Sequence, residues 1–174
     1  MIAMAAKPAQ IVIFGLGGQG ILFLTKLFAE AAALEGREVI VSENHGMSQR
    51  GGAVESHVKI GDFAGPLVRR GRADATLAID PLRFEDARGF VRPGGACFVN
   101  APAAEGARAL DAAAIARELG NARAANIALA GFAAAARPDL FPARASLLAA
   151  LEKISPPKAV DSNRRALLKG MESA

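Results

Sequence analysis

Cysteine and histidine are scarce in this chain of 174 residues, which contains one cysteine, Cys97, and two histidines, His45 and His57. A single cysteine cannot form a disulfide within the chain, and an iron–sulfur cluster normally takes about four thiolate ligands. Two histidines are too few for an ordinary zinc site of about four ligands unless carboxylates contribute. We therefore expect no metal site here, so any cluster with which the chain works must lie on another protein.

Large aromatic residues, charge runs and long apolar runs are lacking as well. Tryptophan and tyrosine are absent, and the net charge of +4, from 21 basic and 17 acidic residues, is scattered along the chain. Nucleic-acid binding is therefore not expected. No apolar stretch approaches the roughly 20 residues of a membrane span, and the N-terminus has no signal-peptide pattern. These absences predict a cytoplasmic protein that binds neither nucleic acid nor membrane.

The composition that remains is typical of a globular domain, with 52% hydrophobic and 22% charged residues. The length is sufficient for one domain with its own core and too short for two full-sized ones. We expect residues 1–9 to form a flexible leader and residues 10–174 a single domain, because no linker or internal repeat divides them. Alanine is concentrated in the last third of the chain, which predicts that this third is helical.

Residues 10–42 have the pattern of a strand, a turn, a helix and a second strand. Residues 10–15 are an apolar run that ends at a glycine, which is typical of a buried strand. Apolar residues then recur at helical spacing from Ile21 to Gly36, where the glycine is a plausible C-cap. Residues 37–42 are predicted to form the second strand. This order predicts the first half of a parallel α/β sheet.

The next segment departs from that order. Residues 43–52 fit neither the helical nor the strand period, so we expect a loop there. In residues 54–60 apolar and polar side chains alternate strictly, which predicts a half-exposed strand in antiparallel pairing. Its polar face, which includes His57, is expected to meet solvent or an interface. The sheet should therefore be mixed.

The rest of the chain continues the α/β pattern. The fold predicted is a three-layer, Rossmann-like α/β domain with a mostly parallel, mixed sheet and an alanine-rich helical C-terminal third. The expected elements are strands over 74–80 and 96–100, a turn over 92–95, and helices over 81–90, 111–119, about 124–136, 143–154 and 158–171.

A glycine motif follows the first strand. Gly15, Gly17 and Gly20 satisfy the pattern G-x-G-x-x-G between a strand and a helix, and Gly18 and Gln19 complete the loop. Such a loop can direct backbone N–H groups at a phosphate at the positive end of the helix. It can equally be a tight turn where the helix packs closely on the sheet. The motif alone leaves both interpretations open.

The dinucleotide version of this motif also needs an acidic residue after the second strand. Glu43 lies 23 residues after Gly20 and could serve, so a stand-alone NAD(P)- or flavin-binding protein is the alternative interpretation. The alternating strand over 54–60 does not fit the usual parallel order of that class. A phosphate loop of the Walker type is excluded, because no Gly-Lys-Ser/Thr follows.

The run Ser48-Gln49-Arg50-Gly51-Gly52 is the more unusual element. A guanidinium beside two glycines can pair with a phosphate or carboxylate on a backbone that another surface can approach closely. The alternative is an arginine that only holds its own loop. Elsewhere we expect His45 to orient the loop and Cys97 to be an inert core thiol. No nucleophile elbow or carboxylate pair suggests a catalytic apparatus on this chain alone.

The two glycine-containing motifs, 15–20 and 46–52, together resemble the gamma-type domain of 2-oxoacid:ferredoxin oxidoreductases, and most of all the small subunit of the indolepyruvate type. The resemblance continues through residues 56–62, Asp74, the Pro93-Gly94 turn, Asn126 and Asn163. It thus covers nearly the whole chain from residue 10. The Ser-Gln-Arg-Gly-Gly run at this distance behind the glycine motif makes it specific.

The resemblance implies a subunit that is inactive alone, in a hetero-oligomer that oxidatively decarboxylates an arylpyruvate with coenzyme A and reduces ferredoxin. It implies that thiamine diphosphate and 4Fe-4S clusters lie on the large (alpha) subunit, with no cofactor bound by this chain alone. No Gly-Asp-Gly thiamine signature is present, since Phe63 follows Gly61-Asp62. The residues expected to bind cofactor, substrate or partner are Gly15, Gly17, Gly18, Gln19, Gly20, Ser48, Gln49, Arg50, Gly51, Gly52 and Asn126.

Overall fold

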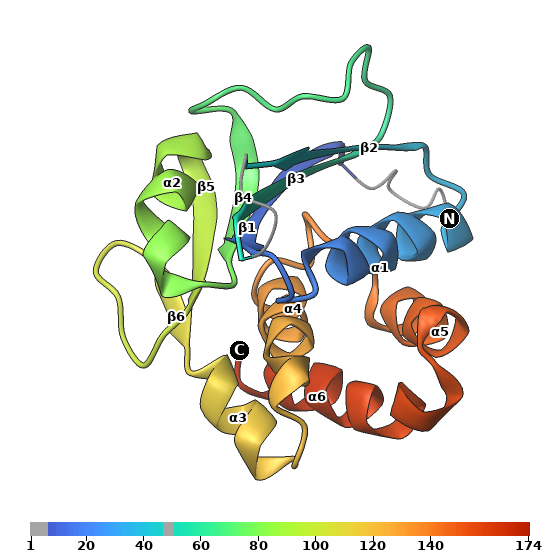
Figure 1. Cartoon of the computed structure of the whole chain (residues 1–174). Coiled ribbons are helices and arrows are strands. Elements are labelled where there is room, and N and C mark those ends of the chain that lie inside the picture. The colour runs from blue at the N-terminus through green and yellow to red at the C-terminus, as the bar shows by residue number, and fades with distance from the viewer. Residues whose placement is uncertain (1–6, 47–50) are drawn as a thin grey trace.

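The computed structural model describes residues 7–46 and 51–174, which form a sheet with helices on both sides (Figure 1). The strands are β1 (Ala9–Leu16), β2 (Val39–His45), β3 (Ala53–Ile60), β4 (Ala73–Ala78), β5 (Val91–Asn100) and β6 (Arg108–Leu110). The helices are α1 (Ile21–Leu34), α2 (Phe84–Phe90), α3 (Ala112–Glu118), α4 (Ala125–Ala136), α5 (Arg144–Ile154) and α6 (Val160–Glu172), with short 3-10 turns η1 (Pro81–Arg83), η2 (Ala122–Ala124) and η3 (Pro157–Ala159).

The sheet is mixed and mostly parallel, as predicted. Its strand order is β2-β3-β1-β4-β5-β6. The pairs β1–β4, β4–β5 and β5–β6 are parallel, whereas β3 runs antiparallel to both β1 and β2. The antiparallel strand β3 therefore separates β2 from β1. The carboxyl ends of β1, β2 and β4 still lie at the same end of the sheet, which we call the carboxyl end.

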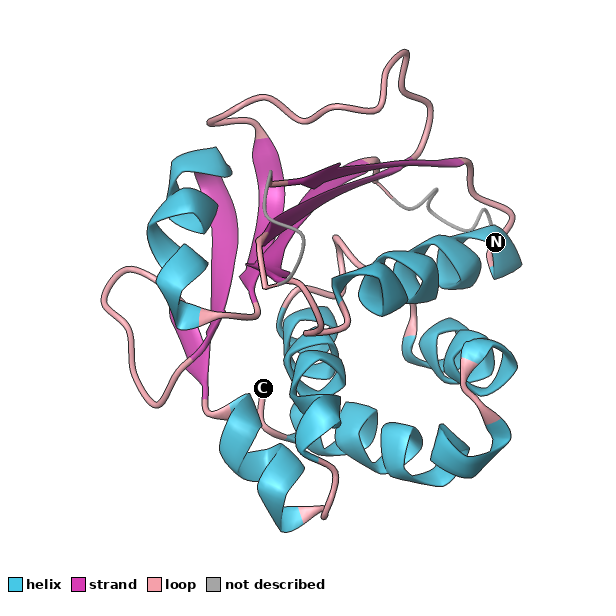
Figure 2. Cartoon of the chain, in the orientation of Figure 1, coloured by secondary structure: helices cyan, strands magenta, loops and turns pink. Residues whose placement is uncertain are grey.

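The sheet lies between helices on its two sides, which gives three layers (Figure 2). Strand β1 is therefore buried on both faces. Ile11 and Ile13 point into the larger core, which contains α1, α4, α5 and α6. Val12 and Phe14 point into the smaller core under α2, where the Phe14 and Phe90 rings meet edge to face with centroids 5.3 Å apart. Burial on both sides explains why residues 10–15 are a continuous apolar run rather than an alternating one.

The C-terminal third is helical and packs through its small residues. Helices α4 and α6 cross so closely that a Cβ atom at Gly131 would overlap the Leu167 carbonyl, and one at Gly170 would overlap the Ala128 carbonyl. The backbones can approach this far only without side chains between them. None of the helices that the structure describes combines the length and apolar character needed to cross a bilayer.

The largest differences between the predicted and the observed element boundaries occur in three places. Strand β2 continues to His45, because Glu43 pairs with Ser56 and His45 with Val54 of β3. The predicted turn over 92–95 lies inside β5, where the register with β4 shifts. The short strand β6 was not predicted, since three residues carry too little pattern to identify.

The polar face of β3 is buried, so the predicted half-exposed strand is wrong on this point. His57 is 3% exposed and Lys59 is 8% exposed. The connection between β3 and β4 crosses this face: the Val68 N–H donates to His57 Nδ1 (3.0 Å), and Lys59 Nζ lies 5.2 Å from the Phe63 ring centroid. The alternation predicted the pairing of the strand correctly, but it could not reveal the cover supplied by this connection.

Candidate functional site

The two glycine-containing motifs meet at the carboxyl end of the sheet. The N–H of Gly17 donates to the Gly52 carbonyl at 2.9 Å, which joins the loop after β1 to the residues that lead into β3. Gly51 has a φ of 67°, a left-handed conformation that favours glycine. The predicted site residues Ser48, Gln49 and Arg50 lie outside the described residues. The contact nevertheless brings the two motifs together through residues that lie 52 − 17 = 35 positions apart in the chain.

Close packing accounts for three of the four glycines in the first motif. A Cβ at Gly15 would overlap the Ile21 side chain, and one at Gly17 would lie 3.3 Å from the Gly51 nitrogen. Gly20 has a φ of 75°, and a Cβ there would overlap Asn126. Gly18 differs, because its φ is 87° and the space beside it is open. This geometry favours the tight-turn interpretation for the motif and leaves Gly18 open to approach.

Gln19 and Asn126, the polar residues of the predicted site that the structure describes, hold the loop in place. The side-chain oxygen of Gln19 accepts from the Leu16 N–H (2.8 Å), and its amide nitrogen donates to Asp80 Oδ2 (2.7 Å). Buried Asn126 donates from Nδ2 to the Gly20 carbonyl (3.0 Å), and its Oδ1 accepts from the Ile127 N–H (2.8 Å). Each side chain thus makes hydrogen bonds through both its oxygen and its nitrogen.

Arg83 is a residue of this loop network that the sequence did not suggest. Its Nη1 donates to the Gly15 carbonyl (3.1 Å) and lies 3.4 Å from the Val54 carbonyl, while its Nε donates to Asp86 (2.7 Å). Its guanidinium also lies 5.4 Å from the Phe14 ring centroid. It therefore ties β1, β3 and the turn after β4 together. The only sequence feature that could have indicated this role is its position shortly after the strand predicted over 74–80.

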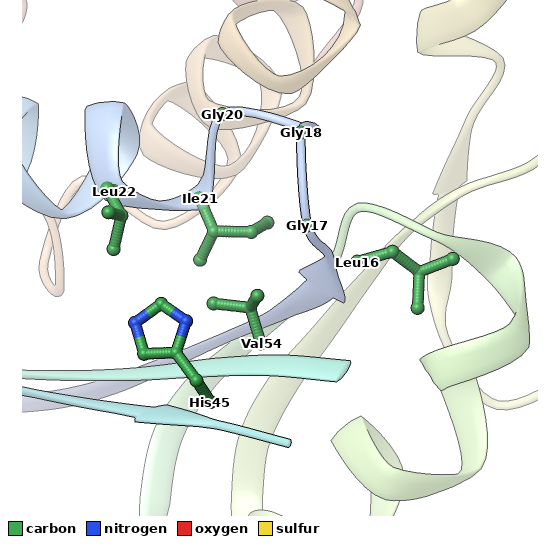
Figure 3. A pocket seen from close by; sticks show the side chains of 8 residues that line it. All are labelled: Leu16, Gly17, Gly18, Gly20, Ile21, Leu22, His45 and Val54. Carbon is green, nitrogen blue, oxygen red and sulfur yellow. The ribbon is translucent and has the colours of Figure 1, made fainter. Parts of the chain in front are cut away.

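A mostly apolar pocket of about 370 Å³ opens between these elements (Figure 3). His45 and Val54 point from the ends of β2 and β3 toward Ile21 and Leu22 in the first turn of α1. Leu22 is 46% exposed, and Leu82 in η1 is 83% exposed. The pocket lining consists of Leu16, Gly17, Gly18, Gly20, Ile21, Leu22, His45 and Val54. An exposed leucine in an apolar pocket, with a second one in η1 at the same end of the sheet, provides apolar surface that another molecule can cover.

Glu43 is not placed as a dinucleotide-binding fold requires. In that fold the acidic residue follows the strand beside β1, whereas here β3 lies between β1 and β2. Glu43 lies at the outer edge of the sheet, with its Oε2 3.9 Å from Nε2 of exposed His45. His45 therefore belongs to an edge strand and not to the predicted loop. The geometry does not support the NAD(P) alternative.

The remaining chemistry-bearing residues show no catalytic arrangement. Cys97 is buried as predicted, and burial raises the pKa of its thiol. Among the described residues, no group of three or more His, Cys, Asp or Glu side chains could hold a metal ion. Buried His57 accepts from the Val68 N–H and lies 2.7 Å from Glu55 Oε1, so it anchors the connection that covers β3.

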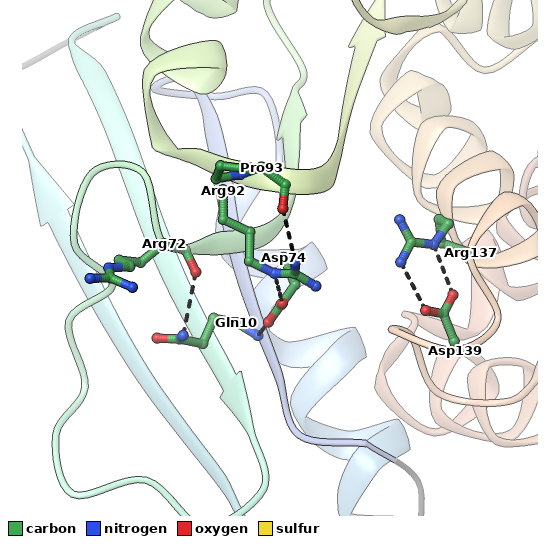
Figure 4. A network of polar contacts seen from close by, with 7 residues as sticks. All are labelled: Gln10, Arg72, Asp74, Arg92, Pro93, Arg137 and Asp139. Atoms are coloured by element: carbon green, nitrogen blue, oxygen red, sulfur yellow. Dashed lines mark hydrogen bonds and ion pairs between the residues drawn. The ribbon is translucent and has the colours of Figure 1, made fainter.

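A different kind of network closes the opposite, amino end of the sheet (Figure 4). The Asp74 carboxylate accepts from the Gln10 N–H at 2.7 Å and from Arg92 Nε at 2.5 Å. It therefore ties the first residues of β1, β4 and β5. A separate ion pair, Arg137 with Asp139, has two nitrogen–oxygen distances of 2.8 Å.

Comparison with known proteins identifies the class. Residues 10–173 match the family described as pyruvate ferredoxin/flavodoxin oxidoreductase, so the chain belongs to this family. Indolepyruvate oxidoreductase subunit IorB of Pyrococcus horikoshii is 34% identical, with 97% of this chain and 96% of the relative covered. The subunit of the same name from Thermococcus kodakarensis is also 34% identical over the same shares.

A solved structure agrees with this membership. The gamma subunit of a keto/oxoacid ferredoxin oxidoreductase from Geobacter sulfurreducens superposes with a TM-score of 0.79 at 27% identity. The match covers 95% of this chain and 98% of that subunit. The relatives carry subunit names, which indicates that the family works as hetero-oligomeric oxidoreductases.

Proposed function

We propose that this chain is the small subunit of a 2-oxoacid:ferredoxin oxidoreductase that acts on indolepyruvate or a related arylpyruvate. The oxo acid loses carbon dioxide, its acyl group passes to coenzyme A, and the electrons released reduce ferredoxin. Two relatives named as indolepyruvate oxidoreductase subunits, each matched over almost their full length, support this substrate class.

The catalytic cofactors belong on a large subunit in this proposal. Thiamine diphosphate supplies the carbanion chemistry of decarboxylation, and 4Fe-4S clusters supply the electron path. One cysteine and two histidines on this chain cannot provide the thiolates for such clusters. The small subunit would contribute a surface that completes the active site from outside. The complex would work in the cytoplasm, with ferredoxin reached through the large subunit.

The carboxyl end of the sheet is the surface that we assign to this role. The observation that carries the proposal is the hydrogen bond from Gly17 to Gly52, which unites both family motifs beside an apolar pocket. Exposed Leu22 and Leu82 surround the same end of the sheet. Desolvating these side chains against a partner stabilises a complex through the hydrophobic effect.

The proposal also includes Arg50, because it directly precedes Gly51-Gly52 of the second motif in the chain. The oxo acid, coenzyme A and thiamine diphosphate are all anions, which a guanidinium binds through paired hydrogen bonds better than a lysine does. Ser48 and Gln49 add neutral donors. The open backbone at Gly18, at the start of α1, suits the approach of a phosphate group such as those of coenzyme A.

Reconstitution of the complex tests this proposal. The chain is co-expressed with its cognate large subunit, and coenzyme A-dependent reduction of methyl viologen is measured with indolepyruvate, phenylpyruvate, pyruvate and 2-oxoglutarate. We expect activity only in the complex and the highest kcat/KM with an arylpyruvate. Stoichiometric iron and sulfide on the isolated chain would contradict the division of cofactors. Micromolar NAD binding that Glu43→Ala abolishes would favour the alternative function.

A further inference from the structure

Most of the outer edge of strand β5 is unpaired among the described residues. Strand β6 pairs only with Phe98–Asn100, so in the described part of the chain no strand pairs with Val91–Cys97 on that side. The register of β5 against β4 also shifts, from Ala73 opposite Val91 to Ala75 opposite Ala96. Unpaired strand edges present backbone donors and acceptors to which another extended chain can bind.

A groove follows this edge. Two adjoining hollows of about 380 and 360 Å³ share Gly95, Cys97 and Gly106, so together they form one elongated groove. Glycine and alanine supply much of its floor, and a Cβ at Gly106 would meet no atom within 4 Å. A floor of small residues allows another backbone to come within the roughly 4.8 Å that strand pairing requires.

The charged groups that line this groove are all arginines. Arg88 and Arg92 line one hollow, Arg108 and Arg137 line the other, and no acidic side chain occurs among the described lining residues. Three of the four are held by carboxylates: Arg88 by Glu85, Arg92 by Asp74 and Arg137 by Asp139. Each guanidinium has five donor hydrogens, so such a pair leaves several free for a further acceptor.

Arg108 is the least constrained of these side chains. It is exposed, its Nη1 lies 3.4 Å from the Ala136 carbonyl, and it forms no ion pair within the described residues. It stands in β6, next to the point where the pairing with β5 stops. A carboxylate entering the groove would therefore meet a guanidinium whose charge is not already neutralised.

We propose that this groove binds an extended acidic segment of a partner protein, which adds a strand along β5. Gly95–Cys97, beyond Pro93 and its missing N–H, provide the main-chain hydrogen bonds, and the arginines pair with alternate acidic side chains of the segment. An elongated groove with a backbone edge fits an extended chain better than a compact polyanion. This surface is separate from the carboxyl end assigned above, and the inference does not depend on the proposed function.

A designed peptide tests the proposal directly. The probe is an acetylated, amidated octapeptide of alternating glutamate and threonine, titrated into the full chain by calorimetry. Three further probes are its lysine–threonine counterpart, the acidic peptide N-methylated at alternate residues, and inorganic tripolyphosphate. Arg108→Glu is the test variant and Arg165→Glu, at an exposed arginine on α6, is its control.

We expect the acidic peptide to bind and to slow amide exchange at Gly95–Cys97. Arg108→Glu should weaken binding by about tenfold or more, through loss of a charge-assisted contact, while Arg165→Glu leaves it unchanged. N-methylation should weaken it similarly, since it removes backbone donors. Equal binding of the lysine peptide, or an unaffected Arg108→Glu variant, would overturn the proposal. Binding of tripolyphosphate but not of the peptide would show a small-anion site instead.

Discussion

The two ends of the sheet are built from different interactions. At the amino end one carboxylate, Asp74, accepts from a backbone N–H of β1 and from Arg92 of β5, so that charge holds three strands together. At the carboxyl end the loops are held by neutral amides, by Arg83 and by closely packed glycines, with leucines left exposed. The Asp74 network at the amino end ties strands to one another, whereas the loops at the carboxyl end also present leucines that the fold does not bury.

The largest effect on stability is expected from Asp74→Ala at the amino end. The substitution leaves the Gln10 N–H and Arg92 without their acceptor, and hydrogen bonds to charged groups contribute about 1.5–3 kcal/mol each. We expect the free energy of unfolding to fall by about 3 kcal/mol in urea denaturation. The control is Glu85→Ala, which removes an exposed ion pair with Arg88 and should cost less than about 1 kcal/mol. An equal decrease in the free energy of unfolding of the two variants would show that Asp74 does not hold the amino end together.

The sequence was sufficient to predict the architecture, but not which interactions hold each end of the sheet. The apolar run 10–15, the glycine C-cap at Gly36 and the N-cap at Asp111 are local signals, and each appears in the structure. The burial of His57 and the hydrogen bonds to Asp74 depend on contacts between residues more than ten positions apart in the sequence. The periodicity of a single segment carries no information about such contacts. The glycine motif showed where the loop lies, but only the structure shows that Gly15 and Gly20 pack against Ile21 and Asn126 while Gly18 stays open.

The second prediction concerns Gly20 at the carboxyl end. Gly20→Ala places a side chain at a φ of 75° and against Asn126, whereas Gly36→Ala meets a φ of 71° with open space. Backbone strain of this kind costs about 1–3 kcal/mol at either position. We expect thermal denaturation to show a larger decrease in Tm for Gly20→Ala than for Gly36→Ala. Only Gly20→Ala should impair viologen reduction by the assembled complex.

The third prediction is that an exposed leucine at the carboxyl end contributes to binding of the large subunit but not to the stability of the chain. Leu82→Asp should leave unfolding within about 0.5 kcal/mol of the parent protein, because the side chain is 83% exposed. It should weaken binding of the large subunit by about tenfold or more, the cost of losing a buried apolar contact. Leu67→Asp is the control at a 60% exposed leucine, on the connection that runs toward the amino end of β4. A comparable loss of affinity in both variants, measured by surface plasmon resonance, would place the interface elsewhere.

The smallest effect is expected from the ion pair of Arg137 and Asp139. The hydrogen bond from Arg137 lowers the pKa of Asp139, so its stabilisation is present above the unfolded pKa and is lost as pH falls through the lower folded value. The Asp139 side chain is 43% exposed, and solvent screening limits the gain to about 0.5 kcal/mol. Unfolding of Asp139→Asn should therefore differ slightly from the parent protein at pH 7 and should coincide with it near pH 2.

Hydrogen exchange on the assembled complex tests the central claim most directly, namely that the carboxyl end of the sheet faces the large subunit. Amide exchange is measured by mass spectrometry for the chain alone and bound to its large subunit. We expect slower exchange in the complex for Leu16–Leu22, Gly51–Val54 and the turn that carries Leu82. Unchanged exchange in these three segments, in a complex that reduces viologen with an arylpyruvate, would contradict it.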